Sequence, residues 1–238
     1  MSGGEKVLSK IARNRRCGWL RLILLHAVLI AATVITVLPV YWTIVTSVKP
    51  LEEVYAYPPR WLPSQWMWHN YVKAWNDAPF ARYAFNSIVV TATIMCSQLV
   101  FATLAAYVFA RLHFLGRDLL FLAFLGTMMV PTQVVVVPTF LLLKIVGWLD
   151  TYMALTVPFL VSAFGTFLIR QSFLAVPQDL IDAARIDGAG HGRIVWNVLV
   201  PVSRPAFLSF ALLTFTWRWN DYFWPLIMTN STAMRTLP

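Results

Sequence analysis

The sequence predicts an all-α membrane protein, a polytopic bundle of transmembrane helices with five spans. Hydrophobic residues make up 59% of the 238 residues and charged residues only 12%, about half the charged share of a typical soluble domain. Several apolar runs approach the roughly 20 residues that a helix needs to cross a bilayer. Six of the 19 basic residues precede the first run, where they would hold its inner end at the membrane surface.

The first half of the chain is predicted to contain an N-terminal anchor and a large external loop. Residues 1–21 form a basic cytoplasmic segment, and residues 22–48 form the first span. That run is longer than a signal-peptide core and has no small-residue cleavage site after it, so we expect it to stay in place. Residues 49–85 form a loop rich in Pro and Trp. Such a loop is either an interfacial belt or a docking surface for an external protein.

Two further spans precede residue 144. The second covers residues 87–110 and carries Gln98 as its main polar interior group, and the third covers residues 119–143 and is interrupted after Pro131. Broken helices at membrane depth usually line protein or water cavities, because the freed backbone groups must find partners. Thr132 and Gln133 are therefore candidate substrate-pathway residues. A kinked packing helix without a ligand fits the same pattern.

The fourth span covers residues 152–169 and completes a region of spans over residues 22–171, and a fifth span begins at residue 206 and leads to an external end at 238. Near the end of the fifth span, Arg218 and Asp221 lie three apart, so they can share a helix face and pair. Ionisable residues at membrane depth are functional candidates, although Trp and Arg together also describe an ordinary interfacial end. Asn220 and Asp221 therefore join the candidates for the substrate pathway.

Between the fourth and fifth spans lies a polar loop, residues 172–205, with its own helical pattern. A short helix opens at Pro177, with Asp179 as its expected cap. Gly188 allows the left-handed turn that ends this helix, and the later glycines extend the break. A second apolar helix follows and is expected to end at Pro201.

The run from residue 182 to 205 resembles the cytoplasmic coupling loop of the membrane subunits of binding-protein-dependent ABC importers. That family's pattern is Glu-Ala-Ala, three residues, Gly, nine residues, then Ile-x-Leu-Pro. This chain has Asp182-Ala183-Ala184, then Gly188, then Val198-Leu199-Val200-Pro201, with Asp in place of Glu and two valines in place of Ile and Leu. Asp187 also fits the pattern. The segment 219–227 (WNDYFWPLI) is similar to one in the carbohydrate branch, which includes maltose-type and glycerol-phosphate-type permeases.

The resemblance implies a permease subunit of an ATP-driven importer for a sugar or sugar-like solute. Its implied partners are a second permease subunit in a heterodimer, two ATP-binding subunits at the cytoplasmic face, and an external solute-binding protein. The implied location is the bacterial cytoplasmic (inner) membrane, in contact with membrane lipid. The residues that would couple to the ATPase are Asp182, Ala183, Ala184, Asp187, Gly188 and Pro201.

Charge supports a cytoplasmic N-terminus. That orientation puts 12 of the 19 basic residues inside and seven outside, in keeping with the positive-inside tendency. The coupling loop then faces the cytoplasm. Five spans leave the C-terminus outside, whereas family members usually continue to a sixth span, so we expect the chain to be truncated relative to the family.

Other function classes find little support in the sequence. There is no Gly-x-x-x-x-Gly-Lys-Ser/Thr phosphate loop, no His-Glu-x-x-His and no Gly-x-Ser-x-Gly, so we expect no catalytic residue, no cofactor and ATP hydrolysis on separate subunits. The four histidines are scattered, which argues against a metal site. The sequence has no stripe of basic residues of the kind that binds nucleic acid. An ion-coupled secondary transporter is the main alternative, but such a protein would need more carboxylates buried in the membrane than this sequence offers. A membrane-embedded enzyme is a more distant one.

Overall fold

The protein is all-helical across the part that the structure describes. The computed structural model describes residues 3–237, with side chains for residue 19 and from residue 21 onward, and it contains no strand in that range. Contacts divide the chain into two compact units, residues 1–78 and 79–238. The predicted fold class is confirmed.

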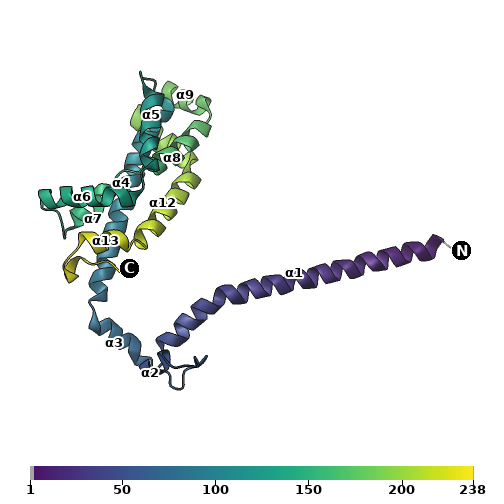
Figure 1. Ribbon diagram of the computed structural model, residues 1–238. Coiled ribbons are helices and arrows are strands. Elements are labelled where there is room, and N and C mark those ends of the chain that lie inside the picture. Colours follow the sequence, from purple (N-terminus) through teal and green to yellow (C-terminus); the bar gives the residue numbers. More distant parts are fainter. Residues whose placement is uncertain (1–2, 238) are drawn as a thin grey trace. The chain divides into compact units, whose positions relative to one another are not determined.

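The first unit consists of a long helix and a folded loop. Its helices are α1 (Gly3–Ser47), α2 (Leu51–Val54) and α3 (His69–Asp77). The apolar part of α1, residues 21–47, is 27 residues long with a mean hydropathy of 2.5, which is enough to cross a bilayer. The α1 backbone continues without a break through the predicted basic segment (purple in Figure 1), so residue 21 is not an element boundary. The basic side chains before it lie outside the described side chains.

The loop after α1 is more ordered than its Pro and Trp content suggests. Lys49 is buried; its Nζ donates to the Arg60 carbonyl oxygen at 2.5 Å and lies 4.3 Å from the centroid of the Trp42 ring. The Trp61 ring packs edge-on against Trp42 at 5.5 Å, while Tyr57 and other aromatic side chains of the loop are exposed. Whether these exposed rings meet lipid or a protein stays a prediction.

The second unit holds the remaining helices. They are α4 (Phe80–Arg111), α5 (Arg117–Gly126), η1 (Thr127–Met129), α6 (Thr132–Val146), α7 (Tyr152–Thr156), η2 (Val157–Phe159), α8 (Ala163–Ala175), α9 (Gln178–Ile186), α10 (His191–Ile194), η3 (Val195–Leu199), α11 (Val200–Val202), α12 (Arg204–Trp219), α13 (Phe223–Met228) and η4 (Thr232–Met234).

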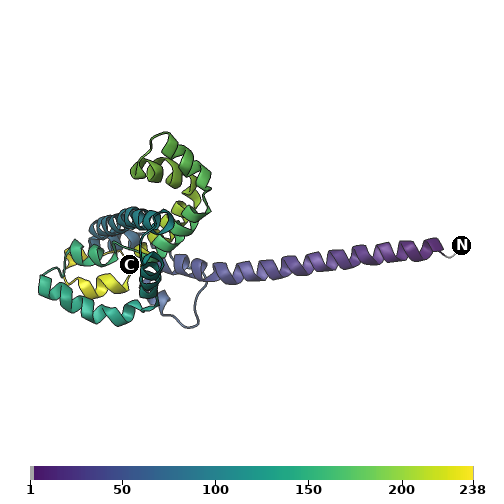
Figure 2. The same cartoon turned by 90° about the horizontal axis from the view of Figure 1, so that it is seen from above.

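Helix α4 is the axis of the second unit, with one buried cluster towards each end. Near its C-terminus, Ala102, Ala106 and Ala110 leave room for the bulkier Ile169 and Phe173 of α8, and α9, α10 and α12 complete this cluster. Near its N-terminus, α4 packs with α6, α7 and α13. Figure 1 shows α9 at one end of α4 and α13 towards the other, and Figure 2 shows α13 beside α6 and α7. Small residues permit this close approach of helices in a bilayer, where packing replaces the hydrophobic effect.

Several predicted boundaries are corrected by the structure. Helix α4 begins at Phe80, seven residues before the predicted second span, so the loop that was predicted to be external ends at Pro79 rather than at residue 85. Helix α8 runs on to Ala175, four residues into the predicted 172–205 loop, and α12 begins at Arg204. In each case the helix is longer than the apolar run that predicts it, because polar residues at a helix end keep helical geometry.

The third and fourth predicted spans are bent helix pairs, and the fifth, α12, forms a bent pair with residues 191–202 of the predicted loop. Residues 117–129 and 132–146 meet at 94°, residues 152–159 and 163–175 at 41°, and residues 191–202 and 204–219 at 81°. In the described part of the chain, two helices are long and apolar enough to span a membrane alone, and there are five spans if each bent pair counts as one. The break predicted in the third span is present, between Met129 and Thr132.

Candidate functional site

The short helix α9 begins where the sequence predicts, but without the predicted cap. Pro177 precedes its first residue, Gln178, and no side chain caps its N-terminus. Asp179 lies inside the first turn, so its prediction as the cap is wrong; a carboxylate there still favours the helix dipole. The Asp182 carboxylate accepts a hydrogen bond from Gln178 Nε2 at 3.0 Å and lies 3.4 Å from Arg185 Nη1.

Gly188 ends α9 in the predicted left-handed conformation. Its φ is +78°, and its N–H donates to the Arg185 carbonyl oxygen at 3.0 Å. The N–H of Ala189 donates to the Ala184 carbonyl oxygen at 2.9 Å, which completes a Schellman motif. The break is shorter than predicted, because α10 starts at His191 and includes Gly192.

The two alanines of the Asp-Ala-Ala triplet face different ways. Ala184 is half-buried and packs with Ile181 against the cluster formed with α4 and α8. Ala183 is exposed, as are Asp182 and Asp187, and the Ile186 side chain is 87% exposed. Helix α9 therefore has one face held by its own subunit and one free apolar face with a carboxylate at each end.

Pro201 lies within helix rather than at its end. Residues 191–202 form one continuous helical stretch made of α10, the π-helical η3 and α11, and the chain turns at Ser203 into α12. Pro201 has no N–H to donate, and it follows the π-helical turn η3 almost directly within this stretch. The prediction that the helix stops at Pro201 is therefore wrong by one residue.

A cavity in the second unit brings together three of the four predicted pathway residues. It has a volume of 360 Å³ and is lined by Thr132, Gln133, Phe159, Arg218, Asp221, Phe223 and Trp224. The Arg218 guanidinium pairs with the Asp221 carboxylate at 3.1 Å, as predicted, and lies 3.8 Å from the centroid of the Phe159 ring. The two residues do not share a helix face, because α12 ends at Trp219 and Asp221 lies beyond it. Asn220 does not line this cavity; its Nδ2 donates to the Thr216 carbonyl oxygen at 2.7 Å.

Residues 98–238 match the family model described as "Binding-protein-dependent transport system inner membrane component". The chain belongs to this family. It is a permease subunit of an ATP-driven ABC importer with several membrane-crossing helices. Family membership supports this function over the ion-coupled secondary transporter.

Named relatives of the permease agree. The sn-glycerol-3-phosphate transport system permease protein UgpE of Yersinia enterocolitica is 33% identical over 217 residues, covering 89% of this chain and 77% of that protein. The protein of the same name from Agrobacterium fabrum is 32% identical over 222 residues, covering 90% and 79%. A crystal structure of a bacterial ABC transporter involved in the import of the acidic polysaccharide alginate superposes with a TM-score of 0.80 at 25% identity, covering 92% of this chain and 76% of that one.

Arg111 holds α9 to the bundle of the permease. From the C-terminus of α4, its Nη2 donates to the carbonyl oxygens of Phe173 and Val176, at 2.5 and 2.6 Å, and its Nη1 donates to Gln178 Oε1 at 2.9 Å. It thus satisfies the open end of α8 and touches the first residue of α9. In the sequence, Arg111 contributes only to the number of basic residues on the inner side. Its position at the end of a span, on the same side as the loop helix, was the signal that could have indicated this contact.

Gln98 holds the bend in the fourth predicted span, between η2 and α8. Its Nε2 donates to the Phe159 carbonyl oxygen at 2.7 Å, and its Oε1 accepts from Thr214 Oγ1 at 3.3 Å. The carbonyl of Phe159 is one that the broken helix leaves open, so a buried amide from α4 satisfies it. The same residue presents its ring to Arg218, so Gln98 positions one wall of the 360 Å³ cavity.

Proposed function

We propose that the permease carries a sugar or sugar-like solute, phosphorylated polyols included, as one of two different permease subunits. Two ATP-binding subunits would bind at the cytoplasmic face, and an external binding protein would deliver the solute. The names of the relatives support this solute class, since one group is named for sn-glycerol-3-phosphate transport and the structural neighbour for import of an acidic polysaccharide. The permease itself would catalyse no chemical step.

The observation that carries the proposal is the two-sided α9. Its free face, with Ala183 and Ile186, offers small and apolar groups to a cleft on an ATP-binding subunit. Its held face is tied through Ile181 and through Arg111 to α4 and α8. A displacement of α9 by closing ATP-binding subunits would therefore move these helices together and produce alternating access.

The proposed orientation places the N-terminus and α9 in the cytoplasm. Twelve of the 19 basic residues then lie inside, with Arg111, Arg185 and Arg193 among them. The opposite end of the second unit, with α13 and the α6–α7 turn, would face outward. The solute pathway would pass the cavity lined by Thr132, Gln133 and Asp221, and Asn220 would act from its rim or from another state of the cycle.

The test is reconstitution of the complete importer in proteoliposomes with its binding protein. We expect uptake of sn-glycerol 3-phosphate or of a neutral sugar such as maltose that requires ATP and the binding protein. An ATP-binding subunit that cannot hydrolyse ATP should abolish it. Uptake that continued with that subunit and followed an ion gradient would instead support a secondary transporter.

A further inference from the structure

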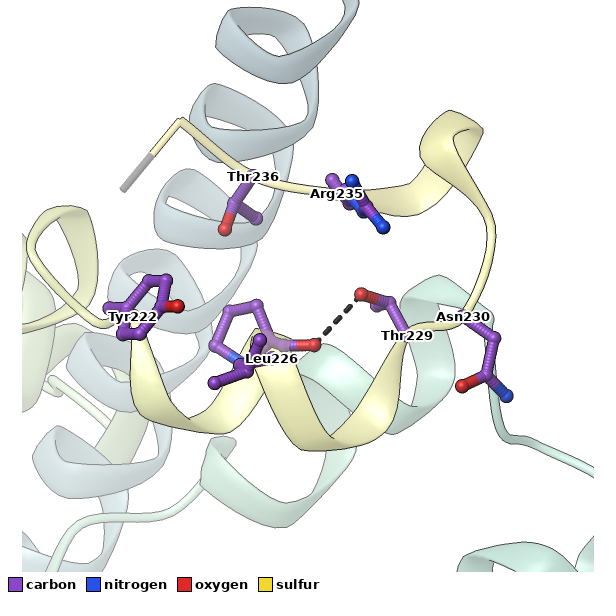
Figure 3. A pocket seen from close by; sticks show the side chains of 7 residues that line it. Tyr222, Leu226, Thr229, Asn230, Arg235 and Thr236 are labelled. Carbon is purple, nitrogen blue, oxygen red and sulfur yellow. Dashed lines mark hydrogen bonds between the residues drawn. The ribbon is translucent and has the colours of Figure 1, made fainter.

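A second cavity lies beside α13, and Pro225 and Thr236 in its lining also border a narrow cavity that contains Arg218 and Asp221. It has a volume of 380 Å³ and is lined by Tyr222, Pro225, Leu226, Thr229, Asn230, Arg235 and Thr236. In Figure 3, α13 forms one wall, and the strand-like segment carrying Arg235 and Thr236 forms the opposite wall. None of the predicted coupling or pathway residues lines it.

Arg235 gives this cavity an uncompensated positive charge. Its side chain is exposed and makes no ion pair with any carboxylate of the described residues, whereas Arg218 is paired with Asp221. Of the acidic groups close to this segment, Asp150 has its Oδ1 occupied by the N–H groups of Asn230 and Ser231, at 2.9 and 3.0 Å, and Asp221 is paired with Arg218. Arg82 adds a second cation behind the wall, where its Nε donates to the Ala233 carbonyl oxygen at 3.2 Å.

Two hydroxyl groups accompany the charge. Thr236 Oγ1 is buried and has no hydrogen-bond partner among the described residues, which is costly for a hydroxyl group. Figure 3 shows this oxygen and the Tyr222 hydroxyl directed into the space between the two walls, while the Asn230 amide points away. Arg235, Thr236 and Tyr222 together offer donors that converge from different sides.

The wall that carries Arg235 is held rigidly. The fully buried Asn86 donates through Nδ2 to the carbonyl oxygens of Ala233 and Arg235, at 2.9 and 2.8 Å. The Tyr152 hydroxyl donates to Asn86 Oδ1 at 2.6 Å, and the N–H of Leu237 donates to Ser87 Oγ at 2.9 Å. These bonds involve the backbone of the segment, so the Arg235 side chain is free to serve a ligand while its position is fixed.

We infer that this cavity binds the anionic end of the transported solute, a phosphate monoester, with Arg235 as the charged donor and Thr236 as the buried hydroxyl donor. A guanidinium recognises phosphate through paired N–H donors, and the orphan hydroxyl supplies a further hydrogen bond. The inference rests on the proposed function, because it presumes a sugar-like solute. Arg235 would then select phosphorylated over neutral solutes at the outer end of the permease.

Protection of Arg235 from an arginine-directed reagent tests the inference without relying on uptake. The assembled importer is placed in phosphatidylcholine vesicles and treated with phenylglyoxal, and the rate of modification at Arg235 is measured by mass spectrometry. We expect inorganic phosphate and sn-glycerol 3-phosphate to slow the modification by a factor of one plus the ratio of free ligand to its dissociation constant, and glycerol to have no effect. Arg60, paired with Glu53 in the other unit, should show no protection and serves as the control position.

Two variants test the separate roles of the Thr236 hydroxyl and the Arg235 guanidinium. Thr236→Val keeps the shape and removes the orphan hydroxyl, so phosphate should protect Arg235 several-fold less well. Arg235→Gln should reduce uptake of sn-glycerol 3-phosphate, whereas Lys144→Gln, an exposed basic residue on α6, should not. ATP-driven uptake with no protection by phosphate would overturn the phosphate site and leave the proposed function standing. If anionic lipid in the vesicles slows the modification of Arg235 without added phosphate, and phosphate slows it no further, the site binds a lipid headgroup. That result would also overturn the inference. If the wild-type importer shows no ATP-driven uptake at all, that result counts against the proposed function instead.

Discussion

Gly165 of α8 lies against the ring of Phe210 of α12, with no room between them for a methyl group. Phe210 is fully buried and packs near Phe164, with ring centroids 6.3 Å apart, so the ring has little freedom to retreat. The two helices approach closely because this position has no side chain, in the way small residues set helix contacts in membranes.

Gly165→Ala should therefore destabilise the permease. Overpacking of a filled interior costs about 1–3 kcal/mol, and we expect a lower midpoint of thermal aggregation in detergent, measured by fluorescence-detected size exclusion. A second substitution, Phe210→Leu, should recover much of the loss by returning the space.

The matched control for this prediction is Gly126→Ala, since a Cβ at Gly126 meets nothing within 4 Å. It should be neutral or slightly stabilising, because alanine favours the helix by about 0.5–1 kcal/mol over glycine. Equal losses at Gly165 and Gly126 would show that the close contact with Phe210 is not the cause.

Gly188→Val should weaken the link between ATP hydrolysis and transport. A residue with a Cβ costs about 1–2 kcal/mol in the left-handed conformation that Gly188 adopts at φ +78°, and a β-branched one more, so α9 would lose its Schellman end. We expect uptake per ATP hydrolysed to fall roughly 5–30-fold, with the subunit still inserted.

For that experiment Gly190→Ala is the matched variant, because Gly190 has a φ of −75° and open space around it. It should keep normal coupling. Unchanged uptake per ATP hydrolysed in Gly188→Val would show that coupling does not depend on the left-handed end of α9.

Cysteines on α9 should report which face meets the ATP-binding subunit. The Ile186 side chain is 87% exposed, while Ala184 is half-buried against its own subunit. We expect Ile186→Cys to crosslink to a cysteine in the cleft of that subunit far more efficiently than Ala184→Cys. A higher yield at Ala184, measured on non-reducing gels, would mean that α9 turns over in the assembled importer.

The Asp150 carboxylate should hold the backbone of residues 230 and 231 in place, except at acidic pH. Hydrogen bonds from the N–H groups of Ser231 and Asn230 lower the pKa of Asp150 below its ordinary value. The stabilisation is therefore present above that ordinary value, about 3.9, and is lost as the pH falls through the lowered pKa. Amide hydrogen exchange of residues 229–237, corrected for intrinsic rates, should show protection at neutral pH that disappears only in that acidic window.

Asp150→Asn tests the same bonds without changing the backbone. Asp150 has a φ of +61°, a conformation that Asn also tolerates. This variant should show weaker protection at neutral pH and no acidic transition. A transition that persisted in Asp150→Asn would have to come from another group.

Part of this molecule follows from local patterns in its sequence. The apolar runs predict the membrane helices, since about 20 such residues suit a bilayer wherever they occur. Gly188 predicts the end of α9, because only a residue without a Cβ takes a left-handed turn cheaply. The pairing of Arg218 with Asp221 is between residues three apart, where the chain leaves α12. Each of these rests on interactions between near neighbours in the chain.

Tertiary structure alone decided the rest. Gln133 and Asp221 share a cavity although 88 positions separate them, and Arg111 reaches the end of α8 from α4. Ala183 and Ala184 are adjacent and alike, yet only packing determines which one faces outward. Such relations depend on which distant helices meet and at what angle, as at the 94° break before Thr132. Side-chain fit between those helices sets that angle, and hydropathy and spacing carry no record of it.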